Sequence, residues 1–296
     1  MSQPFLIVDP STANVDALLP SIEHALSGMK LSAEVRGAPS GVRASAREAL
    51  QSGARFLVAV GDDATVRDVV SAMMEREDHS DLLLGVIPTR DCDLVRTFGL
   101  PQDPLQACAY LTGTEEYQLD IGTAVATGSN GEQVSANFAI VAGVGFGAMM
   151  QKRAAEMPRS LGRSRRFLGF WVALTGSRSA EVEVTVGRKA YRGSAYDVVV
   201  GNCQFFGGGL RVSPRSYPGD GILDVLVMKG PRSAAFTQLP KMYRGEHVPS
   251  TDVVELSGRE IHVKCERPLP VHADGQIIGM TPVAFSVEPK ALRLKV

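Results

Sequence analysis

The sequence predicts a two-part chain, an α/β domain followed by an antiparallel β domain. Strand-like and helix-like segments alternate over about the first 110 residues. From near Asp120 to about residue 285 the segments are short, rich in Val, Ile, Thr and Gly, and separated by turn signals. With 296 residues, 44% of them hydrophobic, the chain can form two cores. We expect domains at 1–118 and 119–285, with 286–296 returning to the first domain as one option.

The N-terminal part has the pattern of a parallel sheet. The apolar runs "FLIVD", "FLVAVG" and "LLLGVIP" are predicted to form buried strands. Apolar residues at helical spacing predict helices at 15–27 and 65–76, with shorter helical pieces at 94–98 and 104–111. Because strands alternate with helices, we expect a sheet covered on both faces. The second part is expected to be an antiparallel sandwich with an inserted helix.

Composition excludes several classes of protein. The 31 Lys+Arg nearly balance 32 Asp+Glu, so no global basic footprint indicates a nucleic-acid partner. The four cysteines are scattered without a Cys-x-x-Cys pair, which favours a reduced chain without a zinc site. The N-terminus does not have the pattern of a signal peptide, and no apolar run reaches the roughly 18 residues of a membrane span. A cytoplasmic protein is expected.

The stretch "LVAVGDDATVRDVV" at 57–70 joins a strand to a helix through a glycine. Such a turn gathers free backbone N–H groups at a helix N-terminus, where anions bind. The turn therefore has two readings. It is either a phosphate cradle or a plain helix start capped by Asp63 or Thr65.

Other stretches favour the first reading. "VGNCQFFGGGLRVSPRSYPGDGILDVLV" at 200–227 is distinctive, and "VDPST", "GVIPTRDCDLVRTFGLP" and "ADGQ" occur at 8–12, 85–101 and 273–276. In this order and spacing the set resembles the diacylglycerol kinase catalytic-domain family of soluble lipid kinases, which includes enzymes of the sphingosine kinase type. The resemblance spans nearly the whole chain and is strongest at 200–227.

The resemblance implies a nucleotide domain, a β-sandwich lipid domain and ATP in the cleft between them. It implies Asp274 as the catalytic base and places Asp220 and Asp224 in a Mg²⁺-associated network. "GDG" and "ADG" are also strong hairpin-turn sequences, and this plainer reading stays open. The residues implied in binding ATP are Asp9, Ser11, Gly61, Asp62, Asp63, Ala64, Thr65, Thr89, Arg90, Asp93 and Gln276.

Several positions depart from the family pattern. Asp62 and Ala64 replace glycines of the phosphate loop, and Cys92 replaces an asparagine of the second loop. Gln276 replaces a glutamate, and Gly147 replaces the aspartate of a Gly-Phe-Asp-Ala element. A carboxylate about 4 Å from a phosphate costs roughly 4 kcal/mol at an effective dielectric constant of about 20.

Asp62 therefore opposes phosphate binding unless it points away or a magnesium ion bridges it to the phosphates. Arg90 either supplies a compensating charge or is an ordinary solvated arginine.

The segment at 151–171, "QKRAAEMPRSLGRSRRFLGFW", is basic and ends in aromatic residues. Charges beside aromatic rings suit an anionic membrane surface, so Arg163, Arg165, Arg166 and Trp171 are expected to dock there. The alternatives are a solvated helix whose aromatic residues pack in the core and, less favoured, a nucleic-acid patch.

Three functions remain open. The first is an ATP- and Mg²⁺-dependent lipid kinase acting on diacylglycerol or a related lipid alcohol. The second is an inactive pseudokinase that binds lipid or nucleotide on the same fold. The third is a kinase for a soluble acceptor, as in the NAD kinases. The expected partner is a lipid at the inner membrane face, to which the chain binds peripherally. Nucleic acid is not expected, and a homodimer stays open.

Overall fold

The computed structural model describes residues 3–9, 15–29, 34–37, 41–157, 168–169, 172–173, 179–231 and 233–296. The chain divides into two compact units. Unit 1 comprises Met1–Ile121 and Pro289–Val296, and unit 2 comprises Gly122–Glu288. The division follows Ile121, three residues after the boundary expected from the sequence, and the C-terminal end of the chain belongs to unit 1.

Unit 1 contains a parallel sheet in the order β14–β4–β3–β1–β2. Its strands are β1 (Pro4–Val8), β2 (Glu34–Gly37), β3 (Phe56–Gly61), β4 (Leu83–Pro88) and the end of β14 (Gln276–Lys295). Arg293 and Leu294 of β14 pair in parallel with Leu83 and Leu84. The predicted parallel α/β part is therefore confirmed.

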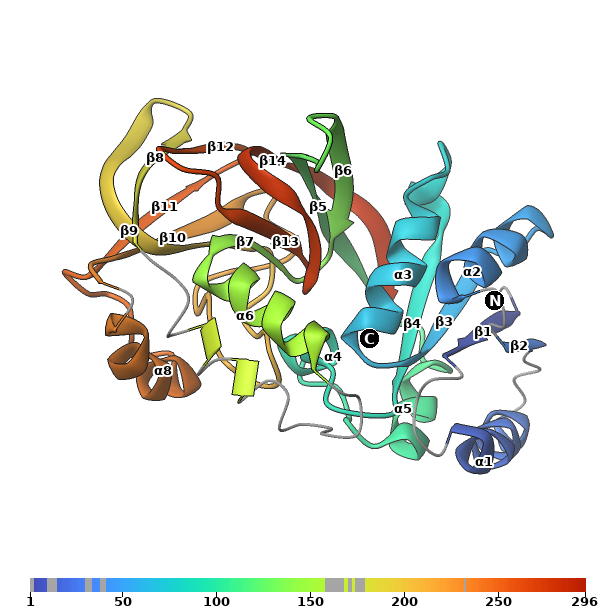
Figure 1. Cartoon of the computed structure of the whole chain (residues 1–296). Helices are drawn as coiled ribbons and strands as arrows, with labels where there is room; N and C mark the ends of the chain where they lie inside the picture. The colour runs from blue at the N-terminus through green and yellow to red at the C-terminus, as the bar shows by residue number, and fades with distance from the viewer. Residues whose placement is uncertain are drawn as a thin grey trace. The chain divides into compact units, whose positions relative to one another are not determined.

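Helices cover both faces of this sheet (Figure 1). They are α1 (Val15–Gly28), α2 (Val42–Gln51), α3 (Asp63–Met73), α4 (Asp93–Thr97) and α5 (Pro104–Tyr110), with a 3₁₀ turn, η1 (His79–Asp81). Helices α2 and α3 pack together, as do α1 and α5. Every residue of β3 is buried, and alternate ones (Phe56, Val58, Val60) pack in a cluster with Ile22 and Leu26 of α1. A strand buried on both faces reads as a continuous apolar run, which explains the sequence pattern.

Unit 2 is built from antiparallel strands. They are β5 (Glu116–Thr127), which begins in unit 1, β6 (Gln133–Phe138), β7 (Val141–Gly145), β8 (Ala180–Val186), β9 (Lys189–Gly201), β10 (Leu223–Lys229), β11 (Val253–Gly258), β12 (Glu260–Cys265), β13 (Pro270–Ala273) and β14. One run has the order β11–β10–β9–β7–β13–β14, and β8 with β12 connects β9 to β14. Helices α6 (Phe146–Glu156) and α8 (Ala234–Arg244) are inserted between strands.

Alternating side chains form the core of unit 2. In β8, Ala180, Val182, Val184 and Val186 are buried, while Glu181, between the first two, is exposed. The inward residues join one apolar cluster with Val198 and Phe285 of other strands. This period of two is the signature of strands buried on one face. The predicted antiparallel β part with an inserted helix is confirmed.

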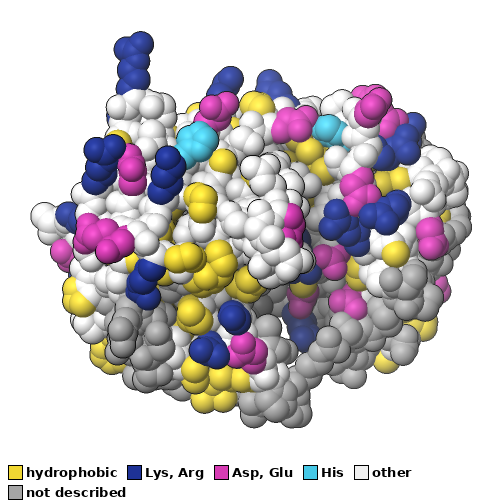
Figure 2. Space-filling view, turned by 45° about the horizontal axis from the view of Figure 1, so that its top comes forward, with side chains coloured by type: hydrophobic (Ala, Val, Ile, Leu, Met, Phe, Trp, Pro, Cys, Tyr) yellow, Lys and Arg dark blue, Asp and Glu magenta, His cyan; other side chains and the backbone are white. Residues whose placement is uncertain are grey.

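Lys and Arg side chains are interspersed with Asp and Glu side chains on the face shown in Figure 2. This mixture agrees with the near-zero net charge of the chain. Within the described ranges, none of the helices has the length and apolar character that crossing a membrane requires.

Candidate functional site

Three loops of unit 1 meet where neighbouring parallel strands end. Thr89, which follows β4, donates its backbone N–H to the carbonyl of Gly61 at 2.9 Å. Thr65 of α3 lies with its Oγ1 3.4 Å from Oδ2 of Asp9, which follows β1. Ligands of open α/β sheets bind at the carboxyl ends of the strands. We call this edge of unit 1, formed by Asp9, the turn Gly61–Thr65 and Thr89–Asp93, the crest.

The turn at the crest needs glycine at position 61. A Cβ on Gly61 would lie 2.0 Å from Thr65 Oγ1, so the inward packing of Thr65 excludes any side chain there. Thr65 is itself buried. The close approach of this backbone to the first turn of α3 is therefore fixed by the pair Gly61 and Thr65.

Asp62 caps helix α3. Its Oδ1 accepts hydrogen bonds from the backbone N–H of Ala64 at 3.0 Å and of Thr65 at 3.4 Å. The suggestion that Asp63 or Thr65 would cap this helix is therefore wrong. A carboxylate now satisfies the amides that would face an anion at a phosphate-binding turn.

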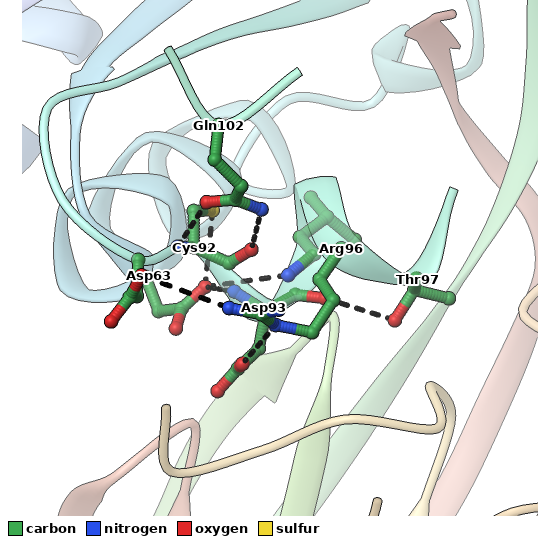
Figure 3. A network of polar contacts seen from close by, with 8 residues as sticks. Asp63, Cys92, Asp93, Arg96, Thr97 and Gln102 are labelled. Atoms are coloured by element: carbon green, nitrogen blue, oxygen red, sulfur yellow. Dashed lines mark hydrogen bonds and ion pairs between the residues drawn. The ribbon is translucent and has the colours of Figure 1, made fainter. Parts of the chain in front are cut away.

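Asp63 connects the turn to the loop after β4 (Figure 3). Its Oδ1 accepts from Cys92 Sγ at 3.1 Å and from the backbone N–H of Asp93 at 2.8 Å and Leu94 at 3.4 Å. Burial is the main cause that raises the pKa of Asp63, and the nearby Asp93 carboxylate raises it further. Burial likewise raises the pKa of the Cys92 thiol well above its usual range, so Cys92 acts as a neutral donor.

Gln102, which sequence reasoning missed, completes this network. It accepts from the backbone N–H of Cys92 at 3.0 Å and donates to the Cys92 carbonyl at 2.9 Å. Asp93 is fully buried and forms an ion pair of 3.6 Å with Arg96 one turn later. These contacts fix the two loops of the crest to each other.

The remaining predicted ATP-binding residues of unit 1 differ in exposure. Ala64 and Arg90 are exposed, whereas Thr89 is half-buried. Thr89 Oγ1 is a buried polar atom for which the described residues provide no hydrogen-bond partner. A polar ligand at the crest would satisfy it. Ser11 lies outside the described residues.

In unit 2, Asp274 and Gly275 form the two-residue turn between β13 and β14, with φ of 43° and 80°. Positive φ at both positions suits a tight hairpin. The Asp274 side chain nevertheless is buried. Its Oδ2 accepts from the N–H of Ala139 at 2.7 Å, and its Oδ1 accepts from Ile140 at 3.0 Å and Val141 at 2.9 Å. These donors fix the orientation of the carboxylate and offset its charge.

Asn202 also binds the backbone of residues 139–141, a role that the sequence alone did not reveal. Its Nδ2 donates to the Ala139 carbonyl at 2.7 Å, and its backbone N–H donates to Ile140. Asn202 follows β9 and opens the "NCQFFGGG" run that carried the sequence resemblance. Gln276, by contrast, starts β14 with an exposed side chain.

Asp220 and Asp224 lie near each other around the start of β10. Burial raises the pKa of Asp224, a hydrogen bond from Ser216 opposes this, and the Asp220 carboxylate adds to the increase. Asp220 is exposed and accepts from the N–H of Ile222 at 3.1 Å. Two adjacent carboxylates fit a hydrated Mg²⁺, which takes few protein ligands. Among the described residues, no three His, Cys, Asp or Glu side chains form a metal-binding group.

The proposed membrane-docking residues Arg163, Arg165, Arg166 and Trp171 lie outside the described residues. Their role stays a prediction, as do the catalytic, nucleotide and metal roles assigned above.

The chain combines a parallel α/β unit that carries the crest with a β-sandwich unit that carries a buried turn carboxylate. Family comparisons assign this chain to the two-domain lipid kinases. Residues 3–124 match the diacylglycerol kinase catalytic domain, and residues 140–296 match the YegS C-terminal NAD kinase beta sandwich-like domain.

The chain is 28% identical over 245 residues to a diacylglycerol kinase of Mycobacterium tuberculosis, covering 80% of this chain and 78% of that protein. It is 29% identical over 275 residues to a Pseudomonas aeruginosa protein described as "Probable lipid kinase YegS-like", covering 90% and 85%.

Solved structures show the same fold. A diacylglycerol kinase from Bacillus anthracis has a TM-score of 0.73 at 19% identity, covering 99% of this chain and 96% of that one. Yeast NADH kinase has a TM-score of 0.56 at 10% identity, covering 99% and 82%. The chain belongs to the diacylglycerol kinase family, with a C-terminal domain of the YegS type, and is thereby a transferase of the lipid kinase class.

Proposed function

We propose that the protein is an ATP-dependent lipid kinase that transfers the γ-phosphate to a hydroxyl of diacylglycerol or a related lipid alcohol. The observation that carries this proposal is the buried Asp274 carboxylate, held by three backbone amides in a chain of the lipid kinase family. A kinase needs such an oriented carboxylate beside the acceptor hydroxyl.

In this proposal the acceptor oxygen forms a bond to the γ-phosphorus while the bond from that phosphorus to the β,γ-bridging oxygen breaks. The hydroxyl proton passes to Asp274, and ADP leaves. The amides of Ala139, Ile140 and Val141 keep Asp274 in place for this transfer. Asp220 and Asp224 would hold Mg²⁺, which would supply positive charge that offsets carboxylate and phosphate charge.

The crest of unit 1 is the proposed phosphate-binding edge. Gly61, Thr65 and Thr89 bring backbone and hydroxyl donors together there, and Thr89 Oγ1 is buried without a partner among the described residues. Asp62 opposes this use, because its carboxylate already accepts from Ala64 and Thr65. We therefore expect weak nucleotide binding.

The Asp62 cap also favours a second candidate, a pseudokinase that binds lipid without transferring phosphate. Calorimetric titration with ATP, with and without Mg²⁺, separates the two when paired with a transfer assay on dioctanoylglycerol. Mg²⁺-dependent binding and a phosphorylated lipid support the kinase. Lipid binding with neither nucleotide binding nor product supports the pseudokinase.

The acceptor lipid would be part of a membrane, so the kinase would act peripherally at the inner membrane surface from the cytoplasm. The basic segment 151–171 is the proposed contact with anionic headgroups. Sedimentation with vesicles of phosphatidylglycerol and phosphatidylcholine tests this. A variant with Arg163, Arg165 and Arg166 changed to Ala should sediment less, whereas equal sedimentation would contradict the docking role.

A further inference from the structure

Helix α8 packs against unit 2 with one face and exposes aromatic side chains on another. Its inward residues Ala235, Leu239 and Met242 line an apolar cavity of unit 2. Phe236 and Tyr243 are instead 54% and 60% exposed. Figure 1 shows α8 at the periphery of unit 2. Large apolar side chains that gather on a protein surface mark interaction sites, so this face of α8 requires a partner.

The exposed residues of α8 follow helical spacing. Phe236, Pro240 and Tyr243 occupy positions i, i+4 and i+7, which places them in one stripe along the helix. All three are exposed. Of the large hydrophobic residues that the structure describes, only Tyr217 is also more than half exposed. We call Phe236, Pro240 and Tyr243 the α8 stripe.

Basic side chains lie beside the α8 stripe. Lys241 and Arg244 are exposed in the last turn of α8, and the sequence of the helix contains no Asp or Glu. Arg211 lies near the same end, because its backbone N–H donates to the Met242 carbonyl at 3.0 Å. Glu246 forms an ion pair of 2.7 Å with Arg244, but both side chains are more than half exposed, and such pairs contribute little. Three cations against one carboxylate leave this end of α8 positively charged.

This combination matches the chemistry of an anionic membrane surface. Aromatic side chains are enriched at the level of the lipid headgroups, and Lys and Arg are attracted to anionic lipids. An amphipathic helix with both features lies in the plane of the interface. The 11 residues of α8 are too few to cross a bilayer, which agrees with that placement. The inward residues fix α8 to unit 2, so the helix presents a shallow stripe that suits a flat surface.

We propose that α8 docks on an anionic membrane surface, with Phe236 and Tyr243 among the headgroups and Lys241 and Arg244 on lipid phosphates. The inference rests on the proposed lipid kinase function, which requires access to a lipid in a membrane. It adds a contact separate from the basic segment 151–171. Because the inward face of α8 lines the cavity of unit 2, docking through α8 brings the wall of that cavity to the membrane.

A single tryptophan tests insertion at α8 itself. Trp171 is the only tryptophan of the chain, so the full chain with Trp171→Phe and Tyr243→Trp carries one reporter, on α8. Vesicles of phosphatidylglycerol and phosphatidylcholine should shift its emission to the blue, and brominated phosphatidylcholine should quench it. Lys189→Trp in the same Trp171→Phe background is the matched control. Figure 1 shows the β8–β9 turn, where Lys189 lies, on the opposite side of unit 2 from α8, so its emission should not change.

Charge variants test the electrostatic part of the docking. Lys241→Gln with Arg244→Gln should weaken binding to phosphatidylglycerol vesicles by about tenfold, because each cation near an anionic surface contributes about a factor of five and Glu246 offsets part of this. Arg188→Gln with Lys189→Gln removes the same charge from the β8–β9 turn and should change binding by less than about threefold. Sedimentation over a range of lipid concentrations gives the affinities.

Aromatic variants test the apolar part. Phe236→Ala with Tyr243→Ala should weaken binding by about tenfold or more to vesicles of phosphatidylglycerol and of phosphatidylcholine alike, because apolar contact does not depend on lipid charge. Both side chains are exposed, so the variant should keep the melting temperature of the wild type.

Three results would overturn the inference. The first is unchanged emission of the tryptophan at position 243 with vesicles that sediment the protein. The second is an equal effect of the two pairs of charge variants. The third is self-association that depends on Phe236 and Tyr243 without insertion into vesicles, which sedimentation velocity detects and which would assign the α8 stripe to a second copy of the chain.

The failures of the two proposals can be told apart. Insertion of α8 into vesicles without phosphate transfer to any lipid alcohol supports the docking surface and contradicts the kinase. Transfer to dispersed dioctanoylglycerol without insertion of α8 supports the kinase and contradicts the docking surface.

Discussion

Asp63 Oδ1 and Cys92 Sγ lie 3.1 Å apart and join two loops that are 29 positions apart in the chain. The same oxygen also accepts from the backbone N–H of Asp93. One carboxylate thus fixes the turn Gly61–Thr65 against the start of α4. The family motif has an asparagine in place of Cys92, so a weaker thiol donor has taken the position of an amide.

Asp63→Ala should lower the free energy of unfolding by about 2–4 kcal/mol, because it leaves buried donors without an acceptor. Cys92→Ala removes only the thiol donor and should cost about 1 kcal/mol. Urea unfolding measures both. Equal losses for the two variants would show that the carboxylate does not organise the crest.

Asp62→Asn should raise ATP affinity without loss of stability. Asparagine is as good a helix cap as aspartate but has no charge to repel a phosphate. Removing a unit charge about 4 Å away is worth up to roughly 4 kcal/mol at an effective dielectric constant of about 20. We expect a gain of tenfold or more in calorimetric titrations. Unchanged ATP affinity in a variant with wild-type melting temperature would mean that phosphate does not bind at this turn.

Asn202→Ala should lower kcat by about tenfold while leaving ATP affinity unchanged. Asn202 donates to the Ala139 carbonyl, and the Ala139 N–H donates to Asp274, so the loss of the Asn202 side chain loosens the support of the proposed catalytic carboxylate. Asn137→Ala is a useful control, because Asn137 lies just before Ala139 in the chain but its side chain donates to Thr123 instead. Equal kcat in both variants would contradict the positioning role of Asn202.

The pH dependence of stability should differ between the wild type and Asp197→Asn. Burial raises the pKa of Asp197 to about 7. The hydrogen bond from the Gly147 N–H lowers this pKa and offsets only part of the increase. The folded state therefore holds this proton more tightly than the unfolded state, for which the usual value is 3.8. The stabilising contribution is complete below about pH 4 and is lost as pH rises to about 7.

The Asn variant cannot ionise and should lose less stability over the same range. Thermal unfolding between pH 4 and pH 8 measures this. Parallel curves for the two proteins would show that burial does not raise the pKa of Asp197 in the folded state.

Much of the fold followed from apolar periodicity. The runs that end at Gly61 and Pro88 became β3 and β4, and the helical spacing of 15–27 became α1. The residue that caps α3 was harder to predict, because the prediction requires the start of the helix to be known to within one residue. Asp62 and Asp63 are adjacent and chemically alike, yet one caps α3 and the other binds the start of α4.

The contacts of unit 2 could not be predicted from local patterns. In "AYDVVVG" Asp197 has the pattern of an ordinary strand residue, and its position beside His272 depends on the register of β9 and β13 against β7. Asn202 was visible as part of a distinctive run, but its bond to Ala139 spans 63 positions. Long-range register is not encoded in any single segment.

The kcat for transfer of phosphate from labelled ATP to dioctanoylglycerol, in the wild type and in Asp274→Asn, tests the central claim most directly. We predict labelled product from the wild type and a loss of about a hundredfold or more in the variant, the usual contribution of a general base. ATP affinity should be the same in both. Absence of product from the wild type, or equal kcat in the two proteins, would contradict the proposed lipid kinase mechanism.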